Sequence, residues 1–160
     1  VHDRPVVDAA MKRAEETGAP AAAMELHDGR MVTGKTSDLL GACAALLLNA
    51  LKELAGIPHD RPVISPAAIE PIQTLKTQYL GSKNPRLHTD EVLIALSVSA
   101  ASDPDAQKAL EQLPNLKGCQ AHTSVMVGDV DRKQFMKLSV QATFEAKYEN
   151  NSVIFPKKGV

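Results

Sequence analysis

The sequence predicts an α/β domain, a three-layer sandwich in which helices cover both faces of a mixed sheet. The pair Asp28-Gly29 separates two runs that contain apolar residues, 21–26 and 30–33, and predicts a β-hairpin. Residues 38–55 are apolar through most of their length, which predicts a central buried helix. Alternating strand and helix patterns over 119–146 predict the remainder of the sheet.

Length and composition limit the function classes. A length of 160 residues predicts one domain, spanning 1–160, and the 44% hydrophobic residues suffice for an aliphatic core. The 19 acidic and 18 basic residues nearly cancel, which argues against nucleic acid or an anionic membrane as partner. Two cysteines make no disulfide framework and favour a cytoplasmic location. The first residue is Val rather than Met, so we expect a processed piece or a part of a longer protein.

Local start and stop signals place the other elements. Pro5 suits the first turn of a helix over 5–17, and Gly18 can end it. Ser65 and Thr89 are each typical of a helix N-cap. The later helices are expected over 66–80, 90–101, 104–113 and 131–138, and the later strands over 119–127 and 140–146.

Residues 29–36 match the phosphate-binding pattern G-x-x-x-x-G-K-T. A P-loop needs a compact glycine-rich turn, whereas the hairpin would extend the residues between Gly29 and Gly34 to roughly 13 Å. Nucleotide binding at Gly29–Thr36 is therefore an alternative rather than the main prediction.

A shorter motif carries the main prediction. Gly34, Lys35, Thr36 and Ser37 precede the buried helix, where N–H groups, a cation and two hydroxyls favour an anion. The alternative is an ordinary N-cap with Lys35 in solvent.

A basic loop before the 90–101 helix is the second predicted part of this site. Lys83, Asn84 and Arg86 are expected to bind the same anion, and His88 and His122 are candidates for proton transfer. The alternatives are a solvated loop behind a capped helix and a strand histidine with satisfied hydrogen bonds.

The order of helix, hairpin and central helix, with the pair Cys43-Ala44, resembles the cytidine deaminase architecture. That family implies a zinc site with a glutamate after the Cys-Ala pair and a P-C-x-x-C segment. Here Ala45 stands at the glutamate position and the chain holds no P-C-x-x-C. The resemblance therefore implies a deaminase-like topology with extra helices, and we predict no metal site.

Recognisable motifs occupy residues 34–37, 44–51, 69–76, 80–91 and 116–122. Together they resemble the bacterial domain-of-unknown-function family 1846, and the match covers nearly the whole chain. Members of that family are much longer, and this chain resembles their C-terminal part. The resemblance implies a multi-part cytoplasmic bacterial protein and brings no established reaction or cofactor.

We therefore expect a ligand-binding or catalytic domain of a larger cytoplasmic enzyme. It would bind a phosphorylated or carboxylated small molecule at a helix N-terminus. The alternative is a structural or oligomerisation module without its own chemistry, and a homo-oligomer stays open under either hypothesis.

Overall fold

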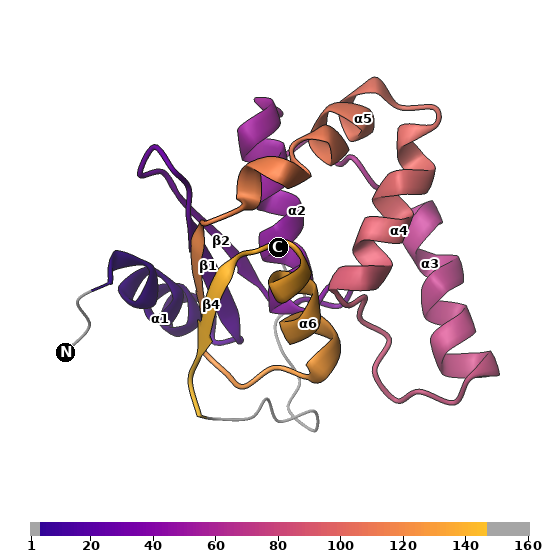
Figure 1. Ribbon diagram of the computed structural model, residues 1–160. Coiled ribbons are helices and arrows are strands. Elements are labelled where there is room, and N and C mark those ends of the chain that lie inside the picture. Colours follow the sequence, from indigo (N-terminus) through magenta and orange to yellow (C-terminus); the bar gives the residue numbers. More distant parts are fainter. Residues whose placement is uncertain (1–3, 147–160) are drawn as a thin grey trace.

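The computed structural model describes residues 4–146, and over that range it has six α-helices and a four-stranded mixed sheet (Figure 1). The helices are α1 (Pro5–Thr17), α2 (Ala42–Ala55), α3 (Pro66–Thr74), α4 (Thr89–Ala100), α5 (Pro104–Glu111) and α6 (Asp129–Lys137). The strands are β1 (Ala21–Glu25), β2 (Met31–Lys35), β3 (Gln120–Thr123) and β4 (Gln141–Phe144). A π-helical turn, Leu75–Tyr79, continues α3, and a 3-10 turn, Leu113–Leu116, follows α5. The predicted α/β class is confirmed.

The sheet order is β2-β1-β3-β4. β1 is antiparallel to both β2 and β3, whereas β3 and β4 are parallel and α6 connects them. The predicted hairpin is confirmed: Glu25 pairs with Met31, and Gly29 takes a positive φ of 90° in the turn, which glycine adopts without steric cost. The sheet is therefore mixed, as predicted.

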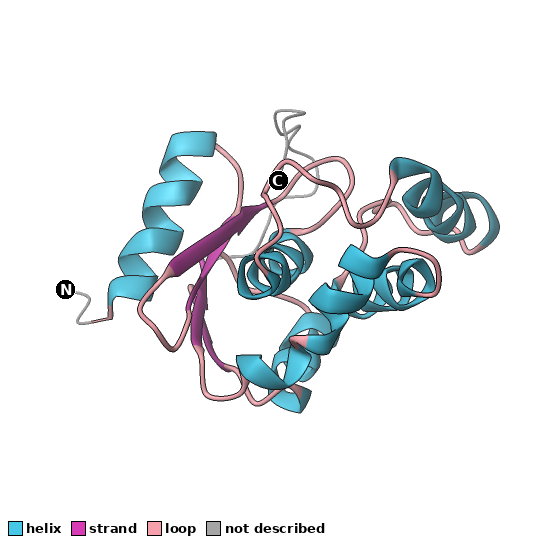
Figure 2. Ribbon diagram, turned by 90° about the horizontal axis from the view of Figure 1, so that it is seen from above, coloured by secondary structure: helices cyan, strands magenta, loops and turns pink. Residues whose placement is uncertain are grey.

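The sheet has helices on both faces (Figure 2). Ala23 of β1 packs with Val6, Val7 and Ala10 of α1 on one face. Its neighbours Ala22 and Met24 point the other way, into the larger aliphatic core that includes α2. The remaining helices lie on the α2 side, with α3, α4 and α5 farther from the sheet. None of the helices within 4–146 is long and apolar enough to cross a bilayer.

Gly34 lies at the closest approach of β2 to α2. A Cβ at this position would lie 2.3 Å from the backbone N of Leu46 and 2.7 Å from the carbonyl carbon of Ala45. These are backbone atoms that cannot move aside, so only glycine lets the strand and the helix pack at this distance.

The prediction that Gly34–Ser37 open the central helix is wrong, because α2 begins at Ala42. Strand pairing continues as far as Lys35, opposite Ala21, and the Thr36 N–H still donates to the carbonyl of Pro20. The chain then turns before Gly41, the N-cap residue. The same extended geometry removes the compact loop that a P-loop at Gly29–Thr36 requires.

Two other elements differ more than the rest from the extent that the sequence predicted. The helix expected over 66–80 changes to π-helical geometry after Thr74. The strand expected over 119–127 is shorter and ends at Thr123, where the Thr123 hydroxyl donates to the carbonyl of Val125. This early end leaves 124–128 as a connection that faces the site described next.

Candidate functional site

A pocket of about 220 Å³ lies where four segments of the chain meet. They are the connection from β2 to α2, the loop before α4, the connection after β3 and the first turn of α6. The lining residues are Thr36, Gly41, Ala42, Cys43, Asn84, Arg86, His88, Thr123, Val125, Met126, Val127, Gly128 and Asp131. The pocket thus contains both predicted motifs in part, because Thr36 comes from one and Asn84, Arg86 and His88 from the other.

Two helices begin at this pocket with glycine as N-cap. Gly41 precedes α2, and Gly128 precedes α6, and neither helix has a hydrogen bond from a cap side chain. The first N–H groups of a helix have no partner within the helix, and the helix dipole places partial positive charge there. Helices of 14 and nine residues therefore direct their positive ends at one pocket.

Thr36 carries a buried hydroxyl without a partner. The residue is 1% exposed, and Oγ1 has no hydrogen-bond partner among the described residues. A buried polar atom without a hydrogen bond costs about 1–3 kcal/mol, and such atoms occur where a ligand or water completes the bonding. Thr36 also lines the pocket, so its hydroxyl is available to a molecule bound there.

Arg86 holds the loop before α4 against the β2–α2 connection. Its Nε donates to the carbonyl of Ser37 at 2.6 Å, and its own N–H donates to Asn84 Oδ1 at 3.0 Å. The backbone of Leu87 adds two bonds, from its N–H to the Leu39 carbonyl and from the Gly41 N–H to its carbonyl. These bonds fix a guanidinium at the wall of the pocket.

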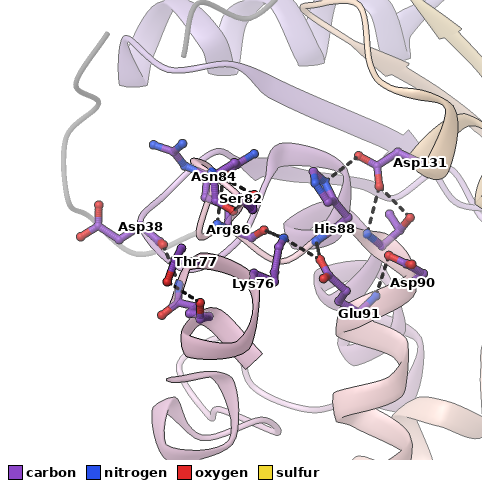
Figure 3. Close-up of polar contacts among 12 residues, drawn as sticks. Asp38, Lys76, Thr77, Ser82, Asn84, Arg86, His88, Asp90, Glu91 and Asp131 are labelled. Carbon is purple, nitrogen blue, oxygen red and sulfur yellow. Dashed lines mark hydrogen bonds and ion pairs between the residues drawn. The ribbon is translucent and has the colours of Figure 1, made fainter. Parts of the chain in front are cut away.

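His88 and Asp131 form an ion pair across the pocket, with 3.8 Å between Nδ1 and Oδ2 (Figure 3). The Asp131 carboxylate raises the pKa of His88 above its ordinary value, against the opposing effect of burial. Burial would raise the pKa of Asp131, but hydrogen bonds from His88 and Thr89 outweigh it and lower that pKa. The pair therefore favours a protonated imidazole beside an ionised carboxylate.

Asp131 also caps α4 from a distant part of the chain. Its Oδ1 accepts from the backbone N of Thr89 at 2.9 Å and from the Thr89 hydroxyl at 2.7 Å. Much of the negative charge of Asp131 thus faces the α4 N-terminus and His88, which reduces its repulsion of a bound anion.

A buried lysine and a half-buried glutamate behind the loop keep it in place (Figure 3). Lys76, from the π-helical turn, donates to Glu91 Oε1 at 2.8 Å and to the carbonyl of Arg86. Glu91 Oε1 also accepts from the His88 N–H at 2.9 Å. The loop that carries Arg86 and His88 is thus fastened to two helices.

Five predicted site residues do not line this pocket. Gly34 and Lys35 belong to β2, and Lys83 is exposed on the loop. The Ser37 hydroxyl accepts the N–H groups of Leu39 and Leu40.

His122 belongs to the opposite face of the sheet from Thr123, since side chains alternate along a strand. Its Nδ1 lies 2.7 Å from the Thr143 hydroxyl, and its Nε2 lies 2.7 Å from Glu145 Oε2. This arrangement matches the alternative of a satisfied strand histidine.

Several pocket residues carried no signal in the sequence. Gly41 and Gly128 occupy the N-cap positions of α2 and α6 but have no side-chain oxygen, so the usual N-cap residue types are missing from the sequence there. Asp131 is separated by 42 residues from Thr89, which it caps. An acidic residue favours the first turn of a helix, so Asp129 after Gly128 is the local sequence feature that could have indicated the start of α6.

The described residues contain no group of three or more His, Cys, Asp or Glu placed to hold a metal ion. Cys43 and Cys119 are both buried and form no disulfide. Burial raises the pKa of the Cys119 thiol.

Comparison with known proteins gives one family and a set of close relatives. The family model for the C-terminal domain of unknown function DUF1846 matches residues 2–154. The UPF0371 protein of Corynebacterium efficiens is 60% identical over 153 residues, 96% of this chain. A UPF0371 protein of Streptococcus thermophilus is 50% identical over 147 residues, 92% of this chain. The chain spans 31% and 30% of the length of these two relatives.

Proposed function

We propose that this chain, which belongs to the DUF1846 C-terminal domain family, is a ligand-binding or catalytic domain of a larger cytoplasmic enzyme. It binds a phosphorylated small molecule in the pocket between α2, α6 and the loop before α4. The observation that carries the proposal is the Thr36 hydroxyl, buried without a partner in a pocket where two uncapped helix N-termini meet.

Phosphate fits this set of donors better than carboxylate. Backbone N–H groups at α2 and α6, the Thr36 hydroxyl and the Arg86 guanidinium approach from different segments of the chain. A phosphate monoester offers three acceptor oxygens arranged around a tetrahedron, whereas a carboxylate offers two in one plane. A volume of about 220 Å³ lies below the range of about 300–1,000 Å³ that is typical of sites for drug-sized ligands, which limits the ligand to a small phosphorylated molecule.

His88 is the proton-transfer group of this proposal. Asp131 faces Nδ1 and favours the protonated ring, which directs Nε2 to a second partner. A ligand oxygen at Nε2 would receive a hydrogen bond from the imidazolium and, in a reaction, its proton. His122 serves the β3–β4 contact instead, through Thr143 and Glu145.

The scaffold of this proposal is a cytidine-deaminase-like arrangement of hairpin, central helix and strand–helix–strand unit. The deaminase reaction is not part of it, because Ala45 stands where that family has its acid.

Thermal unfolding of the full-length protein tests the proposal. Inorganic phosphate and glycerol 3-phosphate should raise the melting temperature, and glycerol should not, because binding to the folded state alone stabilises it. Arg86→Gln should abolish the shift. Lys83→Gln is the matched control, an exposed cation on the same loop but outside the pocket. Absence of any shift, or an equal loss with both variants, would contradict phosphate binding in this pocket.

The second candidate function is an assembly module, favoured by apolar side chains on α4. Ile94 and Val98 are one turn apart and are 60% and 70% exposed. Large apolar residues grouped on one helix face often mark a protein interface. Replacing both with Ser should lower the oligomer mass measured by light scattering if this face joins two copies, and unchanged mass would remove the assembly role.

A further inference from the structure

A second and larger pocket, of about 390 Å³, lies beside α2. The β2–α2 connection borders both pockets: Ser37 and Leu40 line this one, whereas Thr36 and Gly41 line the anion pocket. The size falls in the range of about 300–1,000 Å³ that is typical of small-molecule sites. Its walls are largely apolar, with contributions from Leu39, Leu40, Leu48, Val63, Ile64 and Ile69.

Lys52 places a cation in this apolar wall. The residue is 6% exposed, and its Nζ donates to the carbonyl of His59 at 2.7 Å. The ion pairs among residues 4–146 do not include this ammonium group. Burial is the main cause that lowers the pKa of Lys52, while Asp60 acts in the opposite direction and Arg61 adds to the lowering.

The helix alone does not explain a lysine in this position. Lys52 is in the last turn of α2, where a cation favours the helix dipole, and its bond to His59 holds the following loop. Only one of the three ammonium N–H groups is used, the one that donates to the His59 carbonyl. An exposed lysine could serve the dipole equally well, so burial beside a cavity needs a further reason.

Two acidic side chains that line this pocket are exposed. They are Asp38 and Asp60, and water screens their negative charge. Lys52 is the buried charge among its lining residues. A ligand anion that reached Lys52 would therefore lie in surroundings of low dielectric, where attraction between charges is strongest.

We propose that this pocket binds a small amphipathic monocarboxylate, whose carboxylate accepts a hydrogen bond from Lys52 Nζ while its apolar body packs against Leu48, Val63 and Ile69. The site is separate from the phosphate pocket and does not depend on the function proposed for it.

Calorimetric titration of the full-length protein with octanoate tests this inference. Octanoate should bind at one site, and Lys52→Met should weaken it by about tenfold or more, since the charge-assisted hydrogen bond is lost while the apolar stem remains. Octanol should bind the wild type and Lys52→Met with similar affinity. Lys108→Met, at an exposed lysine of α5, is the matched control and should bind octanoate like the wild type.

Leu48→Trp supplies a second variant, which fills the pocket and leaves Lys52 in place. It should abolish binding of octanoate and octanol alike, and circular dichroism would establish that each variant is folded. Absence of octanoate binding to the wild type would overturn the inference. Equal octanoate affinity of wild type and Lys52→Met would overturn it as well. Phosphate binding is measured separately, by the shift in melting temperature, so failure of phosphate binding and failure of this inference are distinguishable.

Discussion

Two glycines of this domain have opposite surroundings. A Cβ on Gly34 would lie 2.3 Å from backbone of α2, whereas a Cβ on Gly128 would meet nothing within 4 Å. Gly34 belongs to the motif that resembled a phosphate loop, and yet its role is close packing of β2 on α2. Gly128 carried no such pattern and leaves the start of α6 uncapped at the pocket. A glycine in a sequence motif can thus be assigned to packing or to binding only when the atoms around it are known.

Gly34→Ala should have the largest effect. The new methyl would overlap backbone atoms of Ala45 and Leu46, and relief requires β2 to move away from α2. We expect a loss of about 3 kcal/mol or more in the free energy of unfolding, measured by chemical denaturation. Gly128→Ala is the paired control, with a loss of less than about 1 kcal/mol. Similar values for the two variants would refute the packing role of Gly34.

Asp131→Asn should have the next largest effect. It removes the charge that caps α4 and faces His88, with a loss of about 1–2 kcal/mol at neutral pH. The pKa of Asp131 is lowered from 3.8, so its stabilising contribution is present above that value and is lost as pH falls through the lower folded-state pKa. The difference between wild type and variant should therefore shrink in acid, and a difference constant down to pH about 2 would contradict this ion pair.

Thr36→Val should separate stability from binding. Valine has the same shape without the hydroxyl, so the cost of burying an unpartnered Oγ1 disappears and stability should rise by about 1 kcal/mol. Phosphate affinity should fall by about fivefold to tenfold through the loss of one donor. Calorimetry on the same preparation measures both quantities. A purely structural Thr36 would leave phosphate affinity unchanged.

His88→Gln should have the smallest effect, visible as a change in pH dependence. The pKa of His88 is raised above 6.5, so its positive charge is present below that value and is lost as pH rises through the raised pKa. Sulfate is the suitable probe, because its own charge is constant over this range. Wild-type affinity for sulfate should fall with rising pH by about threefold, and the variant should show a flat profile. A wild-type profile as flat as that of the variant would remove His88 from the site.

Local patterns predicted most of the fold. The helix over 5–17 and the hairpin at Asp28-Gly29 each have signals within a few residues. The predicted start of α2 was wrong because Thr36, Ser37 and Asp38 are all residue types that are common at helix N-caps. The actual N-cap residue, Gly41, has no side chain that would mark it in the sequence.

The site was predictable only in part for a related reason. The loop with Asn84, Arg86 and His88 is visible as a cluster of polar residues, and the structure brings it to Thr36. Asp131 reaches this loop only because α6 packs against α4, and no local sequence pattern predicts that packing. His122 looked similar to His88 in sequence, and only strand alternation directs it away from the pocket.

The sheet order also has a consequence for how the chain is made. β1 pairs with its neighbour β2 on one edge and with β3, from the last part of the domain, on the other. During synthesis, the hairpin and α2 leave the ribosome long before β3 does, and β1 then presents an unpaired edge. Until β3 is translated, that edge of β1 has no partner strand from its own domain.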